Sequence, residues 1–167
     1  GQKGRRSKAT GFHRILDATE LEEAELQLKK AESVLKRGVK KEDENTRNLR
    51  RSNWYKVKWA DSVYVIGDFQ KGRAELKGMP GLAAQMAINN GKKVFAFGQS
   101  EGRWFEWRGG ARGRKGQFIE TGKPPRPTMR FAGIAEDKIS HKGKQAIKTL
   151  FSENYVQVPS VTESVSK

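Results

Sequence analysis

The segments SVYVIG at residues 62–67 and KVFAF at residues 93–97 decide the fold of this chain. Each is a short apolar run of β-branched or aromatic residues, which is typical of a parallel strand buried on both faces. Between them, GMPG at residues 78–81 opens an apolar segment that Asn90 and Gly91 close, and this pattern predicts a helix. The sequence therefore predicts a βαβ unit with a right-handed crossover, within an α/β, Rossmann-like parallel sheet with flanking helices.

Hydrophobic periodicity predicts further elements on both sides of this unit. On the N-terminal side, a helix is expected at about 18–36, with a capping box at Asp17 and Glu20 and an end at Gly38, and a second helix at about 46–59. On the C-terminal side, strands are expected at 103–107, 117–120 and 129–134 and a helix at 141–151, with a polar loop at 68–77 and a mobile hairpin loop at 108–116. The expected organisation is a basic arm at 1–16, one Rossmann-like domain at 17–155 and a flexible tail at 156–167.

The charge balance indicates the class of partner. The chain has 34 lysines and arginines against 19 acidic residues, a net charge of +15. Such a charge attracts polyanions through counterion release, so nucleic acid is the first partner to consider and an acidic membrane surface the second. We expect RNA in preference to DNA, in a large assembly such as the ribosome of an organelle or a phage particle. A membrane span is not expected, because no stretch approaches the roughly 18 apolar residues that one needs.

Phosphate contacts are expected where arginines and lysines gather in the sequence. The N-terminal arm is one such segment, the predicted helix at 46–59 is another, and the loop at 108–116 is the third. The nucleic-acid-binding candidates are Lys3, Arg5, Arg6, Lys8, Arg14, Arg47, Arg50, Arg51, Arg108, Arg112, Arg114 and Lys115. The alternative for each is a solvated surface charge.

A small-ligand crevice is the second candidate site. A strand that ends in a glycine turn aims the N–H groups of the next helix at one point, and such a point attracts phosphate. The ligand-binding candidates are Asn53, Gly67, Asp68, Gly78, Gly81 and Gln85. The alternative is that these glycines only permit tight turns. No cofactor is expected, and no metal site, since the two histidines and the absence of cysteine offer no recognised ligand spacing.

Three segments together resemble the SLOG (DprA/LOG-like) Rossmannoid superfamily. They are NWYKVKWADSVYVI at 53–66, GMPGLAAQMA at 78–87 and KKVFAFG at 92–98, and the run 48–107 is most similar to uncharacterised phage and bacterial members that also carry a segment like FAGI at 131–134. The resemblance covers about residues 45–150 and implies a Rossmann-like fold with a nucleotide-related site. Members usually have a further strand before the position of Gly1, so the resemblance implies a sheet that lacks one strand or receives it from a partner.

Departures from the superfamily pattern argue against catalysis. Hydrolytic members have a glutamate where this chain has Gln85, an arginine where it has Ser52 and a glycine where it has Met79. An amide neither takes nor gives a proton at neutral pH, so Gln85 offers no general acid–base chemistry. We therefore expect a non-catalytic module that binds nucleic acid or scaffolds a ribonucleoprotein assembly. The alternatives are a sensor or sponge for a nucleotide-derived small ligand and, in last place, an active nucleotide N-glycosidase in which Arg50 or Arg51 replaces the missing arginine.

Overall fold

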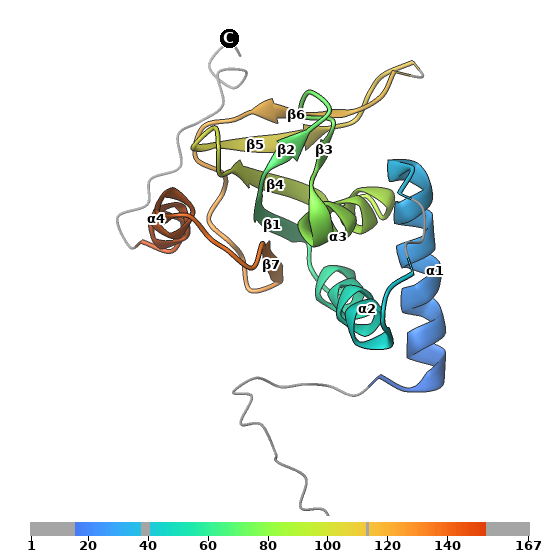
Figure 1. Ribbon diagram of the computed structural model, residues 1–167. Helices are drawn as coiled ribbons and strands as arrows, with labels where there is room; N and C mark the ends of the chain where they lie inside the picture. Colours follow the sequence, from blue (N-terminus) through green and yellow to red (C-terminus); the bar gives the residue numbers. More distant parts are fainter. Residues whose placement is uncertain (1–15, 38–40, 113, 153–167) are drawn as a thin grey trace, which may run out of the picture.

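The computed structural model describes residues 16–37, 41–112 and 114–152 (Figure 1). The elements in chain order are α1 (Ala18–Leu35), α2 (Glu44–Lys58), β1 (Ser62–Gly67), β2 (Phe69–Gln70), β3 (Glu75–Leu76), α3 (Gly78–Asn89), β4 (Lys93–Gly98), β5 (Arg103–Arg108), β6 (Gln117–Glu120), β7 (Phe131–Ala135) and α4 (His141–Leu150). Residues 1–15 of the expected arm and the whole expected tail at 156–167 lie outside the described residues.

The predicted βαβ unit is the centre of a five-stranded sheet. The strand order is β6-β5-β4-β1-β7, and β1 is parallel to both of its neighbours. Strand β5 runs antiparallel to β4, and β6 antiparallel to β5, so a hairpin extends the parallel part. This confirms the expected Rossmann-like α/β fold. The sheet is mixed: the parallel strands β4, β1 and β7 form one end of the strand order, and the antiparallel hairpin β5–β6 forms the other end.

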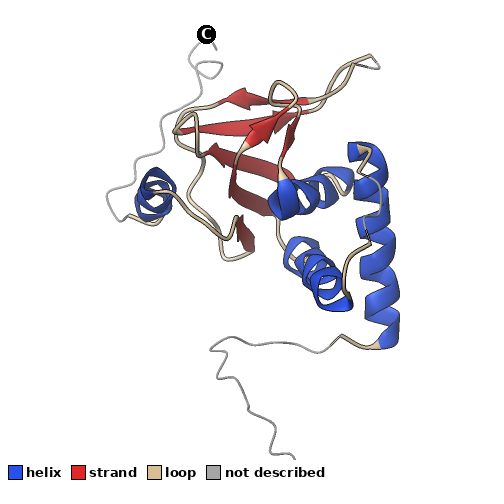
Figure 2. Cartoon of the chain, in the orientation of Figure 1, coloured by secondary structure: helices blue, strands red, loops and turns tan. Residues whose placement is uncertain are grey.

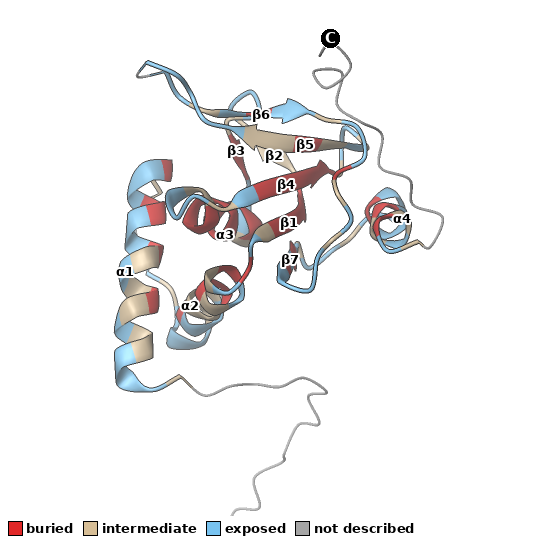
Figure 3. Ribbon diagram, turned by 180° about the vertical axis from the view of Figure 1, so that it is seen from behind, coloured by how far each residue is buried: buried red, intermediate tan, exposed pale blue. Residues whose placement is uncertain are grey.

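The two faces of the sheet are covered unequally. Helices α2 and α3 cover one face and α1 packs outside them, whereas α4 is the one described helix on the other face (Figure 2). Side chains alternate accordingly along β1: Val63 and Val65 join the core under α2 and α3, while Tyr64 and Ile66 face α4. Strands β1 and β4 are buried along most of their length, as their apolar sequences predict (Figure 3).

Helix α1 begins and ends close to where its sequence predicts. The capping box is present, because the Glu20 N–H donates to Asp17 Oδ1 over 2.9 Å and the Asp17 N–H donates to Glu20 Oε2 over 3.0 Å. The helix expected at about 18–36 is confirmed to within one residue: Leu35 is the last helical residue, and Lys36 takes the left-handed conformation with φ 52°. Lys36 therefore serves the role that glycine more often has at a helix end.

The segment 68–77, expected to be a loop, contains the short hairpin β2–β3. Phe69 pairs with Leu76 and Gln70 with Glu75. The Phe69 ring lies 4.8 Å from Phe105 and 5.3 Å from Phe118, so this hairpin packs against β5 and β6. Strands of two residues are too short to show a period of their own, and tertiary packing of Phe69 stabilises them. In the described part of the chain, no helix has both the length and the hydrophobicity required to cross a bilayer.

Candidate functional site

The predicted crevice lies where β1, β4 and β7 end. Asp68 follows β1, Gln99 follows β4 and Glu136 follows β7, so parallel pairing brings these three residues together at one edge of the sheet. Backbone bonds continue the pairing beyond the strands, since the Gln99 N–H donates to Gly67 O over 3.0 Å and the Glu136 N–H to Ile66 O over 3.1 Å. Sequence reasoning identified Gly67 and Asp68 as site residues but not Gln99 and Glu136. These two residues lie near Asp68 only because β4 and β7 both pair with β1, and no local sequence pattern reveals that order.

The side chain of Glu136 bridges the residues that follow β1 and β4 at this edge. Its Oε1 accepts the Asp68 N–H over 3.1 Å, and its Oε2 accepts from Gln99 Nε2 over 3.0 Å. A Cβ on Gly67 would lie only 3.2 Å from Glu136 Oε1. The carboxylate thus already accepts the Asp68 N–H, and an anionic ligand at this position would have to displace it.

The glycines before α3 serve a turn that Arg37 stabilises. Gly78 has a φ of 61°, and a Cβ on Gly81 would overlap the carbonyl of Leu76. The Arg37 guanidinium donates to Gly78 O over 2.7 Å and also to Leu76 O. Burial lowers the pKa of Arg37 from its ordinary value. Arg37 is thus a structural residue that the sequence did not reveal, and it holds the end of α1 against the start of α3.

The remaining crevice candidates are Asn53 and Gln85. Asn53 is buried in α2, within the helical layer. Gln85 is also buried, and its Nε2 donates to Asn89 Oδ1 over 2.8 Å, one turn further along α3. Among the described residues, no hydrogen bond connects either side chain with Asp68 or Glu136.

The three arginine candidates of α2 lie in a cluster of ion pairs with carboxylates of α1 and of the segment before α2. Arg47 is only 6% exposed and contacts Glu32 at 2.5 Å, Glu25 at 2.6 Å and Glu42 at 3.1 Å. Arg51 contacts Glu25 and Glu44, each at 2.6 Å, and Arg50 contacts Glu42 at 3.2 Å.

This cluster binds the helices together and leaves Arg47 unavailable to a phosphate. Hydrogen bonds from Arg47 and Arg51 lower the pKa of Glu25 to about 2, although partial burial opposes the shift. The hydrogen bond with Glu25 raises the pKa of Arg47, although burial opposes this shift. Arg47 therefore stays protonated and paired with the carboxylates of the cluster. Periodicity did not reveal this role, because the acidic partners lie 15 and 22 residues earlier in the chain.

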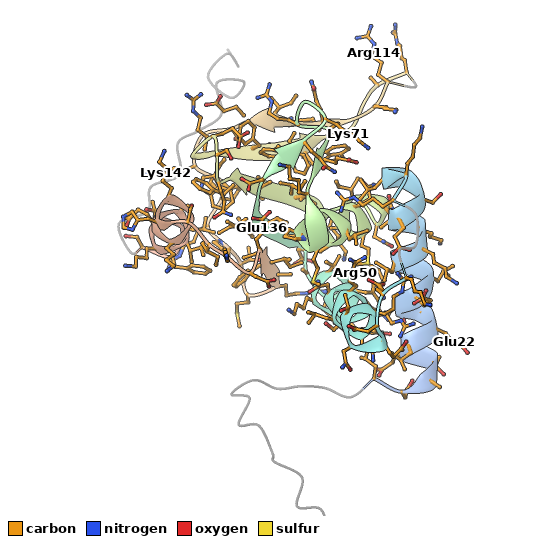
Figure 4. All side chains as sticks on the ribbon, in the orientation of Figure 1. Glu22, Arg50, Lys71, Arg114, Glu136 and Lys142 are labelled. Atoms are coloured by element: carbon orange, nitrogen blue, oxygen red, sulfur yellow. The ribbon has the colours of Figure 1, made fainter. Side chains whose placement is uncertain are left out.

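The hairpin candidates, by contrast, project from the body of the protein. Arg112, Arg114 and Lys115 are exposed in the connection between β5 and β6, and Figure 4 shows Arg114 at its far end, pointing into solvent. Arg108 is exposed at the end of β5 and pairs with Glu106 at 2.9 Å. Within residues 16–37, 41–112 and 114–152, no carboxylate forms an ion pair with Arg112, Arg114 or Lys115.

A second basic loop lies beside this hairpin. Lys71, Gly72 and Arg73 join β2 to β3 and all have positive φ, between 51° and 66°. The Phe118 N–H donates to Arg73 O over 3.0 Å, and the Arg73 guanidinium lies 5.3 Å from the Phe105 ring centre. Lys71 pairs with Glu75 at 2.9 Å. The sequence predicted only a polar loop here, and the fold places this loop next to β6.

The arm candidates Lys3, Arg5, Arg6, Lys8 and Arg14 lie outside the described residues. Within the described ranges, no group of three or more histidine and acidic side chains is placed to hold a metal ion. On the face that carries α4, an apolar cavity of about 220 Å³ opens between the sheet and the helix. Its walls include Tyr64, Trp104, Phe131 and Phe151, and no pattern in the sequence predicted it.

Comparisons with protein-family models, with curated proteins and with solved structures found no match. The candidate sites are therefore defined by their own geometry: an edge of the sheet where Glu136 bonds the residues after β1 and β4, a helical layer with paired charges, and a projecting basic hairpin.

Proposed function

We propose that this chain is a non-catalytic, Rossmann-like module that binds nucleic acid, with RNA as the expected class, through the β5–β6 hairpin. The observation that supports this is the contrast in charge pairing. Acidic residues neutralise Arg47, Arg50 and Arg51 in the helical layer, while Arg112, Arg114 and Lys115 extend from the molecule without an acidic partner in the described residues.

The shape of the hairpin suits contact with a phosphate backbone. Unpaired cations on a projecting two-stranded ribbon meet a polyanion before the rest of the molecule does, and each phosphate that they neutralise releases counterions. The adjacent Arg73 loop widens the same surface. A scaffold role in a ribonucleoprotein assembly follows, because the sheet holds the base of the hairpin through the pairing of β5 with β4. Membership of the SLOG superfamily is part of this proposal, with the βαβ core retained and Glu136 bonded to the residues after β1 and β4.

The test compares two triple variants of equal charge. Replacement of Arg112, Arg114 and Lys115 by alanine removes the hairpin cations, and replacement of Lys30, Lys36 and Lys56 removes three exposed lysines of the helical layer. Affinity for a labelled RNA is measured by fluorescence anisotropy over a range of salt concentrations. Affinity decreases as salt increases, so the slope of log affinity against log salt is negative. This slope should become less steep by about 2 for the hairpin variant, at roughly 0.7–0.9 per lost phosphate contact, and by less than about 1 for the control.

Two outcomes would overturn the proposal. One is a wild-type affinity that does not change between low and high salt. The other is an equal loss in both triple variants, which would indicate that net charge alone, and not the hairpin, governs binding.

A further inference from the structure

Strand β7 forms an open edge of the sheet. Among the described residues it is the last strand in the order and pairs with β1 only. Because the Glu136 N–H donates to Ile66 O and Arg130 O accepts from the Asp61 N–H, the even-numbered backbone groups of this segment face β1. The backbone N–H and C=O groups of Phe131, Gly133 and Ala135 therefore face away from the sheet. Such a row of outward groups is a template for pairing with another strand.

Exposed apolar side chains gather at the start of this edge. Met129 is fully exposed, Phe131 is 39% exposed and Phe151 is 45% exposed, with the rings of Phe131 and Phe151 5.5 Å apart. Trp59 is 60% exposed and lies close by, since Arg130 Nε donates to Trp59 O over 3.4 Å. An apolar group of this size beside an unpaired strand is typical of an interface.

We infer that β7 pairs with β7 of a second copy of this chain, antiparallel across a two-fold axis at Gly133, to form one continuous ten-stranded sheet. The register that centres on Gly133 places Phe131 of each copy opposite Ala135 of the other. All three opposed pairs then consist of outward-facing residues, so each exchanges two hydrogen bonds, about six in total. Any extended peptide could pair with this edge. With a second copy of the chain, however, the outward-facing residues of one β7 oppose the outward-facing residues of the other, so the two strands form the same hydrogen bonds to each other.

The charges at the two ends of β7 complement each other in this arrangement. Arg130 precedes the strand, where it also lies 3.8 Å from Asp61, and the exposed Asp137 follows the strand. Antiparallel pairing places the Arg130 end of one copy against the Asp137 end of the other, whereas parallel pairing would bring like charges together.

Gly133 makes close approach possible at the axis. No atom of the described residues lies within 4 Å of the position that a Cβ on Gly133 would take. Phe131, Gly133 and Ala135 also border the cavity beneath α4, so the second copy would cover the open side of that cavity. The dimer is independent of the proposed nucleic-acid binding, because β7 is at one end of the strand order and the β5–β6 hairpin is at the other end.

Sedimentation equilibrium on the nuclease-treated full chain in high salt tests this inference, since these conditions remove nucleic acid. The wild-type protein should sediment at twice 18.8 kDa. Gly133→Pro should be monomeric with an unchanged circular dichroism spectrum, because proline removes an N–H that makes no bond to β1. Ile119→Lys, at the exposed position of β6 on the other edge, is the matched control and should stay dimeric.

A charge exchange tests the antiparallel register. At physiological ionic strength, Arg130→Glu and Asp137→Arg should each weaken the dimer by about tenfold, and the double variant should restore it. The alanine triple variant of the hairpin should remain dimeric even if it no longer binds RNA. A wild-type monomer at all micromolar concentrations, a dimer that survives Gly133→Pro, or a dimer that Ile119→Lys abolishes would overturn the inference.

Discussion

Arg47 and Arg114 carry the same guanidinium group in two opposite electrostatic settings. Arg47 lies inside the helical layer with three glutamates around it, while Arg114 stands at the end of a hairpin and has no acidic partner in the part of the chain that the structure describes. A buried charge is stabilised by its partners and becomes part of the fold, whereas an exposed and unpaired charge contributes little to stability and remains open to a polyanion. Net charge therefore indicates a function only after the paired cations have been separated from the free ones.

The largest expected effect that separates the two regions is on stability. Arg47→Ala leaves Glu25, Glu32 and Glu42 without their shared partner, so the free energy of unfolding should fall by about 3–5 kcal/mol. Arg114→Ala should change it by less than about 0.5 kcal/mol. Urea denaturation followed by circular dichroism measures both. A loss below that of Arg114→Ala would contradict the structural role of the cluster.

The pH dependence of stability gives a second, intermediate effect. Arg47 and Arg51 lower the pKa of Glu25 to about 2, from an ordinary value of 4.5. The unfolded chain therefore binds a proton at Glu25 first as the pH falls, and the stability that this group contributes is complete above about pH 4.5 and lost towards pH 2. The loss should be about 1–2 kcal/mol, since the side chain is partly screened by solvent. Thermal unfolding across this window should show a smaller decline for Glu25→Gln than for the wild type; equal declines would contradict the ion-pair geometry.

The smallest expected effect concerns the shape of the hairpin. A Cβ on Gly110 would overlap the carbonyl group of Arg114, whereas a Cβ on Gly109 would meet nothing within 4 Å. Gly110→Ala should therefore displace the hairpin end and weaken RNA binding by about threefold, or roughly 0.7 kcal/mol, with unchanged stability of the fold. Gly109→Ala is the matched control and should bind as the wild type does in anisotropy titrations. Identical affinities for the two variants would show that hairpin geometry does not matter.

Sequence by itself determined the elements whose signal is local. The apolar runs at 62–67 and 93–98 form two neighbouring parallel strands with α3 between them, and Asp17 caps α1 as its spacing to Glu20 predicts. These features depend on residues a few positions apart, so periodicity and capping chemistry reveal them.

Tertiary structure alone decided the roles of the charged and polar residues. Glu136 reaches the crevice because β7 pairs with β1, and Arg47 meets Glu25 and Glu32 because α2 packs on α1. The same packing divides the arginines of a basic sequence into structural and exposed ones. The physical reason is that electrostatic interactions act through space between groups far apart in the chain, and a one-dimensional pattern holds no information about which of them meet.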